Sequence, residues 1–95
     1  MKEVIDMTGK FRHRMETQYK INGRFQTQEV TDFGADYTWE NVYNATCADT
    51  LKWFRKIGSK QRVTQTVKNG KYIITIYSYA PHDDKLRNKI VFEEI

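Results

Sequence analysis

The residues of this chain that could take part in chemistry are two histidines, one cysteine and a pair of adjacent carboxylates. His82 stands beside Asp83 and Asp84, so it could bind a metal or act as an acid or base, but three adjacent residues lack the spaced ligands that metal sites need. Cys47 could act as a nucleophile only beside a histidine and with access to solvent. A histidine, His13 or His82, would have to lie beside Cys47 for that role. A small hydrolase or nuclease would therefore need His13, His82 or the Asp83-Asp84 pair to converge in space.

None of these residues forms a catalytic or metal-binding signature. The alternating pattern alone explains the position of His13, and Cys47 falls on the apolar side of an expected helix, where free cysteine packs as a small hydrophobe. The triplet Asp32-Phe33-Gly34 resembles the kinase metal-binding motif only in its letters, since the other kinase motifs are missing. We therefore expect a protein that is not an enzyme and that uses no metal or cofactor.

Two Asn-Gly steps, at residues 22–23 and 69–70, indicate the elements that position these side chains. Asn-Gly tolerates the positive φ angles of a type I′ turn, so each step flanked by alternating residues predicts a β-hairpin. In the first hairpin, from Phe11 to about Val30, two-residue turn arithmetic places Tyr19 opposite Gln26. The same register places Glu16 opposite Glu29, an unfavourable pair of like charges unless neighbouring arginines offset it or the register differs.

The second hairpin runs from about Gln61 to Tyr79, and its predicted register opposes Val63 to Ile76. Between the hairpins the apolar period changes to about 3.6 residues, which predicts one helix from an N-cap at Thr38 to a stop at Gly58. Trp39, Val42, Tyr43 and Cys47 lie on its apolar stripe. Lys89–Glu93 reads as a short closing strand at a sheet edge, after a polar loop from Pro81 to Asn88.

Together these elements predict one α+β domain over residues 1–95. Its antiparallel sheet of two hairpins and a C-terminal strand packs on one amphipathic helix, in the order ββαβββ.

The chain has 95 residues, a formal charge of +4 and a pI near 9.2. This length suits a single core, and the charge gives a mild bias toward acidic partners. With one cysteine, no apolar leader and no membrane-spanning stretch, we expect a cytoplasmic protein that does not contact membranes. The C-terminal edge strand could pair with a second copy to form a homodimer.

Two surfaces carry the residues that could bind a partner. The face of the second hairpin away from the core combines cations with rings, at Lys60, Arg62, Tyr77 and Tyr79. Rings and cations of this kind can stack bases and hold phosphates, can form a protein-binding hot spot, or can simply stabilise a solvent-facing sheet. The first hairpin offers a more charged surface, at Lys10, Arg12, Arg14 and Lys20, beside Phe25. That surface could instead be a solvated strand face that deters edge pairing.

The second half of the chain carries a resemblance to a known group of proteins. It consists of the run from Asp49 to Gly58, the following hairpin, the step Ser78-Tyr79-Ala80-Pro81, and the strand Lys89–Glu93. This pattern resembles small uncharacterised phage and prophage accessory proteins, in which a helix ending in an aromatic, an arginine and a Leu-Gly or Ile-Gly step leads into a hairpin and an edge strand. The resemblance covers roughly residues 49–93 and contains no catalytic residue.

The resemblance implies a phage or mobile-element accessory protein that acts stoichiometrically in the bacterial cytoplasm. Such a protein would inhibit or modulate a host protein or nucleoprotein complex, for example a nuclease, a replication factor, or a CRISPR or other defence effector. The alternative is a stand-alone nucleic-acid-binding protein that uses the same basic and aromatic sheet face.

Overall fold

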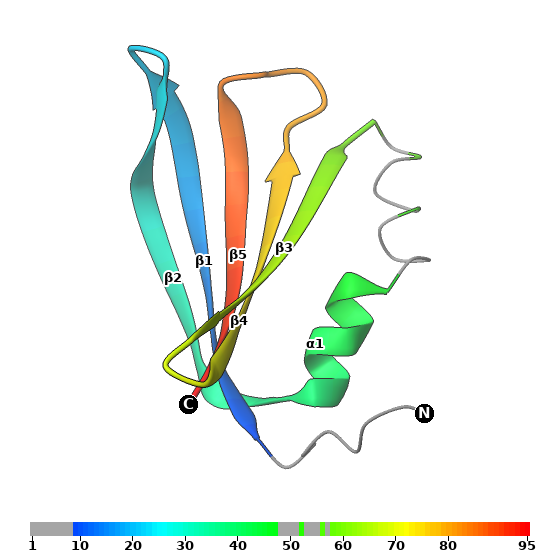
Figure 1. Ribbon diagram of the computed structural model, residues 1–95. Helices are drawn as coiled ribbons and strands as arrows, with labels where there is room; N and C mark the ends of the chain where they lie inside the picture. Colours follow the sequence, from blue (N-terminus) through cyan, green and yellow to red (C-terminus); the bar gives the residue numbers. More distant parts are fainter. Residues whose placement is uncertain (1–8, 48–51, 53–55, 57) are drawn as a thin grey trace.

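The computed structural model describes residues 9–47, 52, 56 and 58–95 as a five-stranded antiparallel sheet with one helix packed on it (Figure 1). The expected order ββαβββ is confirmed. The elements are β1 (Lys10–Ile21), β2 (Arg24–Thr38), α1 (Trp39–Thr46), β3 (Lys60–Lys68), β4 (Lys71–Tyr79) and β5 (Leu86–Glu94). Along the sheet the strands follow the order β2-β1-β5-β4-β3.

The C-terminal strand lies in the middle of this sheet. β5 pairs with β1 on one side and with β4 on the other, so the expectation of an edge strand at Lys89–Glu93 is wrong. The homodimer expected from edge pairing of this strand loses its basis, because both backbone edges of β5 are already paired. The physical reason is visible in the consecutive apolar residues Ile90, Val91 and Phe92, of which Val91 and Phe92 are buried. Neighbouring strands on both sides shield these side chains from water, which favours apolar residues on either face of a central strand.

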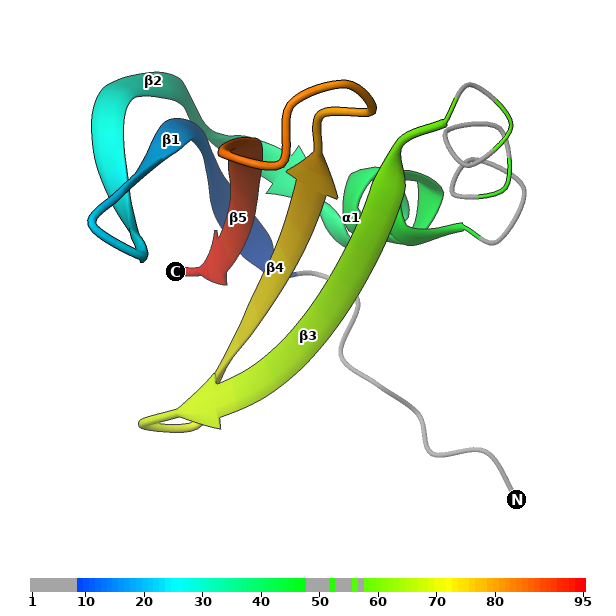
Figure 2. The ribbon, with the colours of Figure 1, turned by 90° about the horizontal axis from the view of Figure 1, so that it is seen from above.

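One face of the sheet carries the core and lies under α1, as the view from above shows (Figure 2). Val42 of α1 packs with four buried sheet residues: Phe11, Ile74, Ile76 and Phe92. The Trp39 ring meets Phe11 edge-on at 4.8 Å between centroids. We call the opposite side of the sheet the outer face. It has a small buried layer of its own, consisting of Gln18, Thr75 and Val91.

The helix begins as expected but ends much earlier. Thr38 is the N-cap, with its hydroxyl accepting from the Asn41 backbone N–H, whereas Cys47 has ψ 138° and closes α1 after eight residues. Thr46 Oγ1 donates to the carbonyls of Val42 and Tyr43. The hydroxyl thus competes with backbone N–H groups for the carbonyls of the last turn, which a longer helix would use. Lys52 and Lys56 are again helical, but most of the expected continuation to Gly58 lies outside the described residues. Tyr43, expected on the buried stripe, is 69% exposed.

The two hairpins differ in regularity. β3 and β4 pair without a register shift, with Val63 opposite Ile76 as expected. β1 and β2 keep the expected register only near their turn, where Tyr19 opposes Gln26, and then shift at three places. The shift between Thr17 and Gln18 places Val30, not Glu29, opposite Glu16, so the unfavourable pair of glutamates does not form.

Both turns use left-handed backbone. β1 ends at Ile21 and β2 begins at Arg24, and the residues between them, Asn22 and Gly23, have φ angles of 53° and 79°. In the second turn Asn69 and Gly70 have φ angles of 54° and 74°. These are the positive angles that Asn and Gly adopt with the least strain.

Candidate partner-binding surface

The outer face is built from cross-strand rows, because residues directly opposite each other in neighbouring strands point to the same side of a sheet. At one end of the sheet, where β1 and β4 end and β3 and β5 begin, one such row crosses all five strands. Its members are Lys60, Tyr79, Arg87, Gln18 and Thr27. The next row toward the middle is Arg62, Tyr77, Lys89, Glu16 and Val30. All four residues predicted from the second hairpin therefore share the outer face.

Arg87 is the centre of this end of the face. Its guanidinium carbon lies 3.8 Å from the centroid of the Phe25 ring and 4.3 Å from that of Tyr77, so two rings from different hairpins contact one cation. Its Nε donates to Gln18 Oε1 at 2.7 Å, and another guanidinium nitrogen donates to the Tyr79 hydroxyl at 3.2 Å. Arg87 thereby connects the first hairpin to the second across the central strand.

Around Arg87 lies a surface that we call the aromatic–cationic patch. It consists of Lys20, Phe25, Lys60, Arg62, Tyr77, Tyr79 and Arg87. Within the described part of the chain, none of its four cations has a carboxylate within ion-pair distance. Lys60 and Arg62 are exposed, while Tyr77 and Tyr79 are half-buried. The patch therefore presents net positive charge and partly accessible rings to solvent.

At the other end of the outer face, the cations are paired with carboxylates. Each of the three cations predicted there forms an ion pair: Lys10 with Asp36 at 3.6 Å, Arg12 with Asp32 at 3.2 Å, and Arg14 with Glu16 at 3.0 Å and Glu93 at 3.2 Å. We call these residues the charge-paired patch. The structure thus divides the set predicted on the first hairpin, since Lys20 lies in the aromatic–cationic patch, where its Nζ is 5.5 Å from the Phe25 centroid.

Asp32 shows how fully the charge-paired patch is neutralised. Its Oδ1 accepts from the Gly34 backbone N–H at 2.8 Å, and its Oδ2 accepts from Arg12. The Gly34 hydrogen bond, followed by the charge of Arg12, lowers the pKa of this carboxyl below its usual value. Because the acid stays ionised beside the guanidinium, Arg12 has little charge left to offer a partner.

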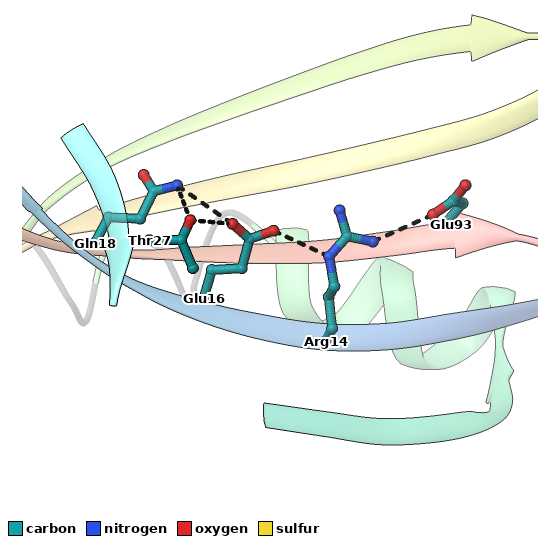
Figure 3. Close-up of polar contacts among 5 residues, drawn as sticks. All are labelled: Arg14, Glu16, Gln18, Thr27 and Glu93. Carbon is teal, nitrogen blue, oxygen red and sulfur yellow. Dashed lines mark hydrogen bonds and ion pairs between the residues drawn. The ribbon is translucent and has the colours of Figure 1, made fainter. Parts of the chain in front are cut away.

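A chain of hydrogen bonds joins the two patches (Figure 3). Arg14 donates to both Glu93 and Glu16, and the other oxygen of Glu16 accepts from Thr27 Oγ1 at 2.6 Å and from the Gln18 amide at 3.4 Å. Gln18 in turn accepts from Arg87. The register shift after Thr17 makes this chain possible, since it places Thr27 directly opposite Gln18.

Glu16 stays charged within this network. Burial alone would raise its pKa, but the hydrogen bonds from Thr27 and Arg14, together with the charges of Lys89 and Arg14, outweigh burial and lower the pKa. Only 13% of the Glu16 side chain is exposed. A partly buried carboxylate held by donors on two strands fixes the geometry of the residues beside it.

The two histidines first considered for catalysis do not come together. His13 lies on the core face, where its ring stacks on Phe92 at 4.3 Å and on Phe33 at 4.7 Å, and burial lowers its pKa. It opposes Phe92, six residues after the start of β5, while His82 precedes that strand, so about 20 Å of strand separates the two positions. His13 and His82 therefore do not converge on one site. Among the described residues no group of three His, Cys, Asp or Glu side chains could hold a metal.

His82, Asp83 and Asp84 instead line one side of an open cavity of about 720 Å³, whose other walls include Lys60, Tyr79 and Pro81. This cavity adjoins the aromatic–cationic patch through Lys60 and Tyr79.

Sequence reasoning missed Arg87. The residue falls in the segment expected to be a polar loop, whereas β5 begins one residue earlier, at Leu86. The alternation of Arg87, Lys89, Val91 and Glu93 was the available signal, since period two places these residues on one face of a strand. Gln18, the buried amide that Arg87 binds, gave no comparable signal.

No family model, curated protein or solved structure matches this chain in comparisons with known proteins. The eight residues of α1 are far too few to cross a bilayer, and the described residues contain no other candidate for such a helix.

Proposed function

We propose that this protein is a non-enzymatic binding module that docks on its partner through the aromatic–cationic patch. The observation that carries the proposal is a group of four cations around two tyrosines and a phenylalanine, none of which has a carboxylate partner among the residues that the structure describes. Arginine and tyrosine are enriched where protein interfaces concentrate their binding energy. Unpaired cations also favour encounter with an acidic surface.

The partner we propose is a protein or nucleoprotein complex with an acidic surface in a bacterial host. This protein would act stoichiometrically, as an inhibitor or modulator of phage or mobile-element origin working in the cytoplasm. The origin and the inhibitory role rest on the sequence resemblance over residues 49–93. The location of the contact rests on the patch.

A single charge reversal tests where the partner binds. Purified Arg62→Glu and Lys71→Glu variants would each be immobilised and exposed to nuclease-treated bacterial lysate. Both residues are exposed and lie on the same hairpin, at opposite ends. We expect Arg62→Glu to lose partner capture by about tenfold or more, as hot-spot changes do, and Lys71→Glu to capture as the wild type does. Equal capture by the two variants would contradict the proposal.

A second candidate function is direct binding of nucleic acid by the same patch, and the unpaired cations favour it. One face of the Phe25 ring and one face of the Tyr77 ring are occupied by Arg87, which leaves fewer ring faces for stacking bases. Phosphate contact predicts that the logarithm of affinity falls linearly with the logarithm of salt, by about 0.7 to 0.9 per neutralised phosphate. A gel shift with single-stranded and duplex DNA and RNA tests this candidate. It is run at about 50 mM salt, since counterion release favours binding at low salt. Absence of retardation would discard this candidate.

A further inference from the structure

The sheet has two edges, and they differ in how well they are protected against pairing with another strand. β2, at one edge, carries three register shifts against β1, and bulges of this kind twist an edge away from further pairing. β3, at the other edge, pairs with β4 over nine residues without a shift and contains no proline. Within the described part of the chain, no element pairs with the outer side of β3. β3 is therefore an open, regular edge.

The turn at Asn69-Gly70 determines which backbone groups of β3 face outward. In an antiparallel ladder, hydrogen-bonded and non-hydrogen-bonded pairs alternate, and the residues that flank a two-residue turn form a hydrogen-bonded pair. Lys68 and Lys71 are that pair. Counting back along β3, the N–H and C=O groups of Val67, Gln65 and Val63 point away from β4. These three residues are the ones that could bond to a further strand.

The sequence around these residues is symmetric. Val63-Thr64-Gln65-Thr66-Val67 reads the same in both directions, and none of the five carries a charge. Two antiparallel copies centred on Gln65 would place Gln65 opposite Gln65, Val63 opposite Val67, and Thr64 opposite Thr66. Val63 and Val67, which are 39% and 61% exposed in one chain, would then contact each other across the junction.

We propose that two copies of this chain associate through their β3 strands, in antiparallel register about a two-fold axis at Gln65. The three outward-facing positions would then exchange backbone hydrogen bonds with their opposites, and four exposed valines would form two cross-strand pairs. The occupant of this edge is a second copy because the uncharged segment is complementary to itself. The interface meets the aromatic–cationic patch only at Arg62, and the backbone pairing that holds it stands whether or not that patch binds a partner.

The pairing would join two sheets into one of ten strands. Directly opposed residues in an antiparallel pair point to the same side, so the outer faces of both copies lie on the same side of the combined sheet. The two aromatic–cationic patches would thus face a partner together, one on each side of the two-fold axis.

One feature opposes this dimer and gives it a measurable signature. The register places Arg62 of each copy opposite Lys68 of the other, which is an unfavourable pair of like charges that occurs twice. Salt screens such exposed repulsion. We therefore expect the dimer to become tighter as salt is added, the opposite of the salt dependence of phosphate binding.

Disulfide trapping tests the register. In a Cys47→Ser background, Gln65→Cys places two thiols at directly opposed positions, where Cα atoms are about 5.5 Å apart and a disulfide can form. Thr64→Cys is the matched control, since its two thiols would occupy diagonal positions about 7 to 8 Å apart, beyond the reach of a disulfide. We expect mild oxidation to give covalent dimers with Gln65→Cys only. Equal trapping of both variants, or of neither, would overturn the register.

Sedimentation equilibrium of the wild type and of Lys68→Glu tests the association itself. The substitution turns both like-charge pairs into attractive ones, so we expect the dimer dissociation constant of Lys68→Glu to be about tenfold lower. Added salt should screen this attraction and weaken the dimer of this variant. Gln65→Pro should give a monomer that remains folded, because the lost N–H points outward and proline is tolerated at such edge positions. A wild type that stays monomeric at several hundred micromolar, or a dimer that Gln65→Pro leaves unchanged, would overturn the proposal.

Discussion

The two ends of the outer face are made from similar residues and behave differently. The charge-paired patch sets Lys10, Arg12 and Arg14 against four carboxylates, while the aromatic–cationic patch sets its cations against rings and an amide. Exposed ion pairs contribute little to stability and leave little net charge. A guanidinium between rings keeps its full charge, so only the second patch combines cations with a field that a partner can sense.

Removing Arg87 should have the largest effect of any single change on this comparison. Arg87→Ala leaves the buried Gln18 oxygen without its donor, at about 1–3 kcal/mol, and removes two cation–ring contacts worth about 0.5–1 kcal/mol each. We expect the free energy of unfolding in urea to fall by about 2–5 kcal/mol, by the same two effects. A loss no larger than that of Arg12→Ala would show that the two patches are energetically alike.

Replacing Glu16 should reveal the link between the patches. Glu16→Gln keeps an acceptor but removes the charge that Arg14 and Thr27 hold, and we expect a loss of about 1–2 kcal/mol. Because folding lowers the Glu16 pKa, its contribution is present above the usual pKa of glutamate and is lost as the pH falls through the folded value. Urea unfolding between pH 7 and pH 3 should therefore show a shallower decline in the variant. Parallel curves for the two proteins would contradict a charged Glu16.

Mild acid should destabilise the protein through His13, which lies on the core face. Folding lowers the pKa of His13, so the unfolded chain takes up the proton first and stability falls as the pH drops below about 6.5, the usual pKa of histidine. We expect the thermal midpoint to be lower at pH 5.5 than at pH 7.5 in the wild type. The corresponding difference should be smaller in His13→Phe, which retains the stacking on Phe92. If the difference between the two thermal midpoints is the same in His13→Phe as in the wild type, His13 does not cause the acid sensitivity.

The smallest effect is expected in the charge-paired patch. Arg12→Ala breaks an ion pair in which both side chains are more than half exposed, so the free energy of unfolding should change by no more than about 0.5–1 kcal/mol. Urea unfolding in low and high salt would measure it. A larger loss would mean that this patch is a structural network like the one around Arg87.

Short-range patterns predicted more of this molecule than long-range ones could. The register of the second hairpin followed from its turn, and Lys60, Arg62, Tyr77 and Tyr79 were correctly assigned to one face. The central position of β5 was missed, because sequence order does not specify which strands become neighbours. The shift after Thr17 was also missed, although the unfavourable pairing of Glu16 with Glu29 was a sign of it.

The helix and the binding surface show the same limit. Periodicity continued past Cys47, but the Thr46 hydroxyl competes for carbonyls of the last turn, a local effect that periodicity does not detect. Phe25 joins the second hairpin through Arg87, whose guanidinium lies over its ring from the central strand, and through its edge contact with Tyr79. Lys20 joins it through Phe25. A pattern confined to one hairpin carries no information about a contact of that kind.

The most direct test of the central claim compares double charge reversals at the two ends of the outer face. Lys60→Glu/Arg62→Glu and Lys10→Glu/Arg12→Glu change the net charge equally, and circular dichroism would verify that both remain folded. Capture of the partner from nuclease-treated lysate would then be quantified for each variant. We predict that the first variant loses capture and the second retains it. Equal loss would mean that net charge alone attracts the partner, and the reverse pattern would assign the contact to the charge-paired patch.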